Sequence, residues 1–216
     1  MKIQYRYPKL YQIFVHKVLY PKRLWEKLRL EVGEKNTVFD VAAGYGYASN
    51  FLHPSNTYYG IDLNKNSVMY ARKRGVDLEL KNIFDPRAYK TNDIFLAIDI
   101  IHHLTPEKMN KLFSLIFQHA KRKVIVIEPA FVSITRKYGL FGKLLGWLFR
   151  ILDEDGFTKI KHWLSEKEYQ SLFRSHFSSE YGKNFEVDLQ RVAGYHFVIF
   201  TKRKDTTKMS QRVGID

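Results

Sequence analysis

The residues that could do chemistry begin with two glycines after a short apolar run. The run Thr37–Val41 is followed by Ala-Ala-Gly44-Tyr-Gly46. A strand-to-helix turn with two glycines lets a ligand approach the backbone closely. A second run, Thr57–Asp62, ends in an acid, and a carboxylate at that place can accept hydrogen bonds from both hydroxyls of a ribose. The order of strand, glycine turn, helix, strand and terminal acid therefore predicts a nucleotide-type ligand site.

A second set of candidates follows two later apolar runs. His102 and His103 come after the run 94–101, and Glu128 comes after the run 124–127. The carboxyl ends of parallel strands meet at one edge of a sheet, where such folds bind ligands. Histidine titrates near neutral pH and can act as a general base, and Glu128 could act as a base or anchor an acceptor. The alternative is that one histidine packs or caps locally.

The absence of cysteine excludes several kinds of site. A disulfide framework, a cysteine-zinc site, an iron–sulfur cluster and a thiol nucleophile all need that residue. The His, Asp and Glu residues show no paired metal-ligand spacing. We therefore expect no metal.

The elements that must position these residues alternate along the chain. We expect strands at Thr37–Val41, Thr57–Asp62, 76–84, 94–101 and 124–127, helices at 66–74 and from Thr105-Pro106, and an antiparallel pair of strands at 185–189 and 195–201. This alternation predicts an α/β fold: a doubly wound, mainly parallel seven-stranded sheet whose last strand is antiparallel.

The remaining segments suggest additions to one domain of residues 37–202. Residues 1–36 should form an N-terminal helical cap, with a second helix that has Pro21 at its first position and ends at Gly33. The segment 131–163 is expected to be an inserted lid, since 141–152 is almost wholly apolar; the alternative is a core helix. A capping box at residue 165 predicts a helix to about residue 174. Residues 203–216 lack periodicity, which predicts a disordered basic tail.

The charge distribution bears on partners rather than on chemistry. The chain has 36 Lys and Arg against 22 Asp and Glu, a net charge of +14. Most of the excess lies in the cap, the lid segment and the tail. Positive peripheral segments favour nucleic acid, an anionic membrane surface or an acidic substrate as partner, and general solubility is the alternative. No apolar run suits a signal peptide or a membrane span, so we expect a cytoplasmic protein that could lie peripherally on a membrane.

The glycine turn resembles the first motif of the class I S-adenosylmethionine-dependent methyltransferases of the small-molecule type. That motif is an acid followed by alternating small residues, matched by Asp40, Ala42, Gly44 and Gly46, with Ala42 where glycine is commonest. The second motif, an acid that closes strand two, is similar to Gly60-Ile61-Asp62-Leu63. The segments 93–104 and 123–129 resemble the family's fourth and fifth strands. The similarity runs from about residue 37 to residue 130.

The resemblance implies S-adenosylmethionine as cofactor. Asp40 and Gly44 would then lie near its methionine part, Asp62 would hold the ribose, and Asn82 with Ile83 would contact the adenine. Members often carry an acid where Asn82 stands, and Asp85 is a competing candidate. The full set of expected cofactor residues is Asp40, Ala42, Gly44, Gly46, Asp62, Leu63, Asn82, Ile83, Ala97 and Ile98.

The resemblance further implies methyl transfer to a small or lipid-like acceptor. The chain lacks the Asn/Asp-Pro-Pro-aromatic signature of enzymes that methylate amino groups, which favours O- or C-methylation. Three alternatives remain open. One is an RNA methyltransferase that uses the aromatic and basic residues of the cap. Another is a nicotinamide dehydrogenase, whose third glycine would fall at Ser49. The last is a non-catalytic binding or scaffold protein.

Overall fold

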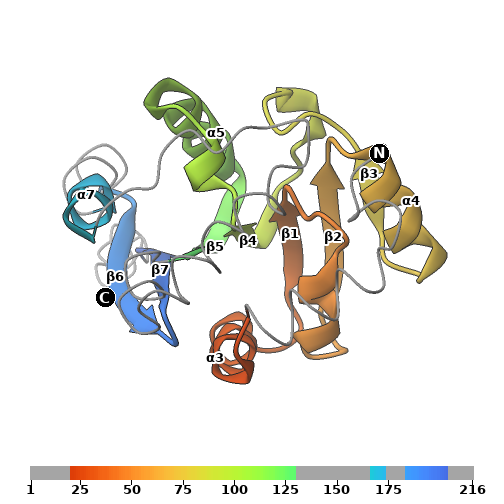
Figure 1. Cartoon of the computed structure of the whole chain (residues 1–216), viewed down its shortest axis with the longest axis horizontal. Helices are drawn as coiled ribbons and strands as arrows, with labels where there is room; N and C mark the ends of the chain where they lie inside the picture. The colour runs from red at the N-terminus through yellow and green to blue at the C-terminus, as the bar shows by residue number, and fades with distance from the viewer. Residues whose placement is uncertain (1–19, 130–165, 174–182, 204–216) are drawn as a thin grey trace, which may run out of the picture.

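The computed structural model of the protein describes residues 20–129, 166–173 and 183–203. In these ranges the chain forms one seven-stranded sheet in the order β3-β2-β1-β4-β5-β7-β6 (Figure 1). The strands are β1 Thr37–Val41, β2 Thr57–Asp62, β3 Leu78–Leu80, β4 Asn92–Ile98, β5 Ala120–Pro129, β6 Phe185–Val192 and β7 Tyr195–Lys202. The first five strands pair in parallel, and β7 pairs antiparallel with both β5 and β6. The predicted fold class is thus confirmed.

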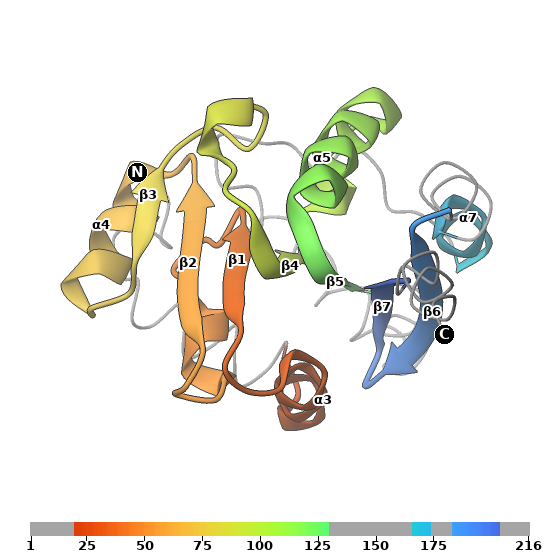
Figure 2. The ribbon, with the colours of Figure 1, turned by 180° about the vertical axis from the view of Figure 1, so that it is seen from behind.

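Helices cover both faces of the sheet, as its apolar strands require. The helices are α3 Lys22–Val32, α4 Lys65–Lys73, α5 Pro106–His119 and α7 Glu166–Ser171, and the short 3-10 turns are η2 Tyr47–Phe51, η3 Pro86–Ala88 and η4 Ile101–His103. α3 packs on one face together with η2, and α5 packs on the other (Figures 1 and 2). The predicted stripe of α5 (Met109, Leu112, Phe113 and Ile116) is buried. Alternate residues of each central strand therefore belong to different cores.

Two strands are shorter than the sequence predicts. The third strand ends at Leu80, because the Asn82 side chain accepts a hydrogen bond from the Phe84 N–H (2.9 Å) and turns the chain. The fourth strand ends at Ile98, because Asp99 adopts a left-handed conformation (φ +58°) that leads into η4. His102 and His103 therefore lie in a tight turn beyond the strand.

The helices differ from prediction only at their ends. Pro21 is the N-cap of α3 with extended backbone, so the helix begins at Lys22, one residue later than predicted, and Gly33 ends the helix as expected. α7 occupies residues 166–171 of the helix predicted to run to about 174. Thr105 is the N-cap of α5, as predicted. In the described ranges, no helix is long and apolar enough to cross a membrane.

Several predicted features lie outside the described residues. They are the first helix of the cap, the lid at 131–163 and the tail beyond Arg203. The division of the chain into cap, domain, lid and tail stays a prediction.

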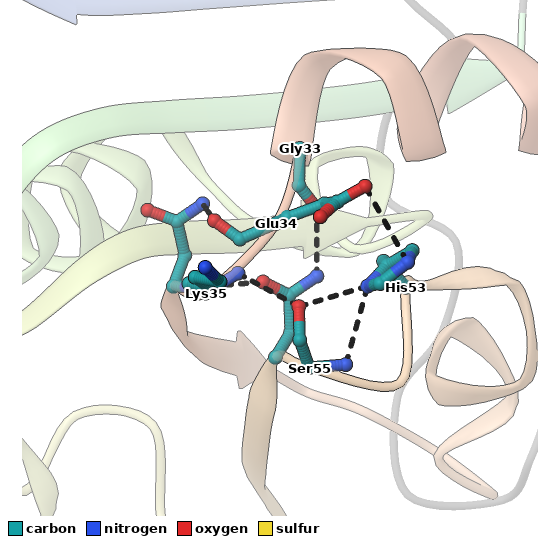
Figure 3. A network of polar contacts seen from close by, with 7 residues as sticks. Gly33, Glu34, Lys35, His53 and Ser55 are labelled. Atoms are coloured by element: carbon teal, nitrogen blue, oxygen red, sulfur yellow. Dashed lines mark hydrogen bonds and ion pairs between the residues drawn. The ribbon is translucent and has the colours of Figure 1, made fainter.

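Two turns at the amino edge of the sheet fasten β1 to β2 (Figure 3). The Lys35 N–H donates to Ser55 Oγ (3.0 Å), and the Asn56 side chain donates to the Gly33 carbonyl (2.8 Å). His53 lies between Ser55 Oγ (Nδ1, 2.8 Å) and Glu34 (Nε2, 3.4 Å). The Ser55 backbone N–H also donates to His53 Nδ1, so this group holds the turn.

Candidate functional site

The glycine turn follows β1 at the carboxyl edge of the sheet. Ala42, Gly44 and Gly46 all have positive φ (+59°, +55° and +66°). A Cβ at Gly46 would lie 2.7 Å from Val76 Cγ1, so this glycine is needed for packing. A Cβ at Gly44 would meet no atom within 4 Å. The turn thus leaves space beside Gly44, where a ligand could contact its backbone.

Asp62 ties the end of β2 to this turn. Its Oδ2 accepts the Gly44 N–H (2.7 Å), and its Oδ1 accepts the Asn64 N–H (2.7 Å). Each carboxylate oxygen has further acceptor capacity, so Asp62 can also bind hydroxyl groups. The neighbouring Leu63 is 53% exposed. Asp62 therefore lies beside Gly44, where a Cβ would meet no atom within 4 Å.

Asp40 is buried below the same turn. Only 3% of the residue is exposed, and its Oδ2 accepts a hydrogen bond from the Tyr58 hydroxyl (2.6 Å). Its Oδ1 is also buried and has no hydrogen-bond partner in the described part of the chain. Burial raises the pKa of Asp40 to about 7; the charge of Asp62 also raises it, and the Tyr58 hydrogen bond lowers it. A buried acceptor oxygen at the predicted ligand site thus has no hydrogen-bond donor among the described residues.

The residues that we expect at the adenine form local contacts of their own. Asn82 is exposed, and its side-chain oxygen already accepts the Phe84 N–H. Ile83 is buried, and its carbonyl accepts the Tyr89 hydroxyl (2.5 Å). Asp85 pairs with Arg87 (3.0 Å), which holds the pKa of the carboxyl below its usual range. The competing candidate Asp85 is therefore engaged locally.

The two predicted residues from the fourth strand differ in their surroundings. Ala97 is fully buried in β4 between Val41 of β1 and Val126 of β5. Its side chain belongs to the core cluster on the α5 face, so only its backbone could meet a ligand. Ile98 is partly buried and packs against the cluster beneath α3.

Glu128 is the centre of a buried polar cluster at the carboxyl edge. It is 0% exposed, and its Oε1 accepts the N–H groups of Ile100 (2.7 Å) and Ile101 (2.6 Å). Its Oε2 lies 2.8 Å from His102 Nδ1 and accepts a long hydrogen bond from the Tyr169 hydroxyl (3.5 Å). The structure thus brings Glu128 and His102 together. Both oxygens of Glu128 thus accept hydrogen bonds within the cluster, and its predicted role as a base or acceptor anchor stays a prediction.

His103 packs against the His102 ring, whereas the hydrogen bond to Glu128 is made by His102. The two imidazole rings are tilted with centroids 4.1 Å apart, and both residues are buried. Of the two predicted histidines, His102 has the carboxylate partner that a base of this type requires.

The sequence analysis missed several members of this cluster. Asp99 Oδ1 lies 3.7 Å from His102 Nδ1, and its Oδ2 accepts the Tyr20 hydroxyl (2.5 Å). The Tyr169 ring packs on His196 (centroids 4.3 Å apart), which β7 places opposite Glu128. Asp99 was detectable as a polar residue that closes an apolar run. Tyr20, Tyr169 and His196 reach the site only through tertiary packing.

The cluster also resembles a metal-ligand set. One donor atom each from Asp99, His102 and Glu128 lies within 4.8 Å of the others, a spacing that could hold a metal ion. His102 Nδ1 hydrogen-bonds Glu128 Oε2, and Glu128 Oε1 accepts two backbone N–H groups. The expectation of no metal stays a prediction.

Comparisons with known proteins agree on the fold. No family model matches the chain, and no sequence match is found among the curated proteins. Solved structures do match. Magnesium protoporphyrin IX methyltransferase from Synechocystis PCC 6803, with bound S-adenosylhomocysteine, superposes with a TM-score of 0.54 and 15% identity, covering 84% of this chain and 80% of that one.

Two further structures are similar in the same way. Human N-acetylserotonin methyltransferase in complex with S-adenosylmethionine gives a TM-score of 0.61 at 16% identity, covering 91% of this chain and 55% of that one. A S-adenosylmethionine-dependent methyltransferase from Archaeoglobus fulgidus gives 0.61 at 14% identity, covering 89% and 99%. With the strand order and the antiparallel β7, these matches show that the chain has the Rossmann-like fold of class I methyltransferases.

Proposed function

We propose that this protein is a S-adenosylmethionine-dependent methyltransferase that acts on a small-molecule acceptor. The observation that carries the proposal is the glycine turn. Asp62 of β2 accepts a hydrogen bond from this turn, and Asp40 below it has one buried oxygen without a donor among the described residues. Supporting it, the similar solved structures are methyltransferases, two of them with the cofactor or its product bound. Sequence identity of 14–16% supports a shared fold, and the methyltransferase activity is our proposal.

The residues at the turn fit this cofactor. Gly44 leaves space for close approach, and Asp40 Oδ1 offers a buried acceptor for a cationic amino group. Asp62 has acceptor capacity for ribose hydroxyls, and Asn82 with Ile83 remain the proposed adenine contacts. When bound, the cofactor supplies a methyl group on a sulfonium sulfur. Intact Gly44, Gly46 and Asp62 disfavour a non-catalytic scaffold.

The pairing of Glu128 with His102 favours an acceptor that must lose a proton. Glu128 can accept the Nδ1 proton of His102, which leaves Nε2 with the lone pair of a general base. Its side chain is 0% exposed, and such a dry site strengthens the interaction with the carboxylate. A hydroxyl acceptor benefits most from such a base. We therefore propose O-methylation, with His102 as base and Glu128 as its orienting partner.

The acceptor is proposed as a small or lipid-like molecule. The lid segment and most of the cap, which would select it, lie outside the described residues. The proposed partners RNA and anionic membrane depend on those same basic segments, as does the proposed location, cytoplasmic and peripheral to a membrane.

The test is calorimetric titration of the purified protein with S-adenosylhomocysteine, with NAD as the control ligand. We expect micromolar binding of S-adenosylhomocysteine and none of NAD. A panel of hydroxylated lipids, quinols and phenols then follows, with release of S-adenosylhomocysteine as readout. Binding of NAD alone would indicate a dehydrogenase, and cofactor binding without turnover on any acceptor, RNA included, would favour a scaffold.

A further inference from the structure

Tyr58 and Asp40 lie on the same face of two neighbouring strands. In the parallel pairing of β1 with β2, Val38 stands opposite Tyr58 and Asp40 stands opposite Gly60. The Tyr58 hydroxyl reaches along the sheet and donates to Asp40 Oδ2 at 2.6 Å. A Cβ at Gly60 would lie 2.8 Å from Ala43 Cβ and 3.1 Å from the Asp40 carbonyl oxygen. The glycine therefore lets the turn close over this pair.

The surroundings of Asp40 leave its protonation finely balanced. Its charged and titratable neighbours in the described part of the chain are Tyr58 and Asp62, both from β2, while β4 places Leu96 opposite it. Burial and the charge of Asp62 raise the pKa of Asp40 to about 7 against the Tyr58 hydrogen bond. Burial and Asp40 itself raise the pKa of Tyr58, so the phenol remains a donor at neutral pH.

The second oxygen of Asp40 lacks a donor. Oδ1 is buried and accepts no hydrogen bond from the described residues. A buried acceptor without a donor is unfavourable, and an ionised one more so. A ligand that brings a cationic N–H group would satisfy Oδ1 and favour the ionised carboxylate at once.

We propose that Tyr58 is a positioning residue for the cofactor, whose hydroxyl holds Asp40 Oδ2 so that Oδ1 accepts from a cationic amino group and Asp40 loses its proton when the ligand binds. The inference rests on the proposed function, since it needs a cofactor with an ammonium group. The proton passes to the solvent, so at slightly acidic pH binding releases up to one proton per site. Tyr58 acts through Asp40 and need not touch the ligand.

The experiment is calorimetric titration with S-adenosylhomocysteine from pH 5.5 to 8.5, in two buffers that differ in ionisation enthalpy. For the unmodified protein we expect affinity to rise with pH up to about 7 and then level off. Without the Tyr58 hydroxyl the ionised carboxylate is less stable. We expect Tyr58→Phe to bind roughly five- to tenfold more weakly at pH 6 and to approach the unmodified affinity at pH 8.5.

Two variants serve as controls. Tyr59→Phe removes a hydroxyl from the next residue, whose ring packs on Phe39 on the opposite face, and its pH profile should match that of the unmodified protein. Asp40→Asn cannot ionise, so its affinity should be low, flat with pH and without proton release. Circular dichroism establishes that each variant is folded.

Three results would separate the possibilities. A Tyr58→Phe profile that superimposes on the unmodified one would overturn the inference. So would proton release that persists in Asp40→Asn, since His102 or another group would then be its source. If the unmodified protein binds no S-adenosylhomocysteine at any pH, the proposed function itself fails.

Discussion

Nδ1 of His102 lies 2.8 Å from Oε2 of Glu128, and both side chains are closed off from solvent. The same carboxylate accepts two backbone N–H groups from the turn that carries the histidine. Glu128 therefore fixes both the path of the backbone after β4 and the orientation of the imidazole. One acid at the end of β5 thus couples the stability of this cluster to its proposed chemistry.

Removing Glu128 should destabilise the protein strongly. In Glu128→Ala, the N–H groups of Ile100 and Ile101 and the His102 ring would lose a buried acceptor, which should lower the free energy of unfolding by roughly 3–5 kcal/mol. Urea unfolding measures the change. The exposed Glu26 of α3 provides the control, and Glu26→Ala should change little. Equal stability of the two variants would show that Glu128 is dispensable for the turn.

Removing His102, the proposed base, should affect turnover rather than cofactor binding. For His102→Gln we expect kcat to fall by about 10²- to 10⁴-fold, because the acceptor hydroxyl would lose its general base. The Kd for S-adenosylhomocysteine should stay nearly constant, since Asp40, Gly44 and Asp62 remain. Release of S-adenosylhomocysteine with an acceptor from the panel is the readout, and His53→Gln at the opposite edge is the control. An undiminished kcat would remove His102 from the chemistry.

Filling the space beside Gly44 should block the ligand without unfolding the protein. Gly44 and Gly75 both have positive φ, and a Cβ at either would meet no atom within 4 Å. Each alanine variant should therefore lose a similar, modest stability of about 1–2 kcal/mol from left-handed backbone strain. Only Gly44→Ala should weaken S-adenosylhomocysteine binding, by more than about tenfold, which corresponds to about 1.4 kcal/mol of binding free energy. Comparable affinities in calorimetry would mean that the ligand does not lie against Gly44.

The buried Asp40 should make the ligand-free protein less stable as the pH rises. Its folded pKa of about 7 exceeds its ordinary value of 3.8, so the folded state keeps a proton that the unfolded chain has lost. The contribution of Asp40 to the free energy of unfolding is complete below about pH 4, falls between pH 4 and 7, and is constant above pH 7. The total decline is about 4 kcal/mol at most. Urea unfolding at pH 4.5 and 7.5 measures it. Asp40→Asn should lack this component, and an unchanged pH dependence in that variant would contradict the assignment.

The sequence by itself determined the order of elements and predicted the edge of the sheet where a ligand is proposed to bind. Apolar runs covered on both faces, such as Phe95–Ala97, read as buried parallel strands because a strand between two helix layers has no polar face. Gly44, Gly46 and Asp62 indicated the proposed site because backbone freedom and charge belong to residue type. These features depend on residue type and on the local pattern of residues, both of which can be read from the sequence.

Only the tertiary structure decided which polar groups meet. The partners Tyr58 and Asp40 are 18 residues apart, and His102 and Glu128 are 26 apart. Their contacts depend on strand register, which places Gly60 opposite Asp40 and His196 opposite Glu128. Whether a carboxylate is a base, an orienting group or a proton store depends on burial and on its hydrogen-bond donors. Those arise only when distant strands pack side by side.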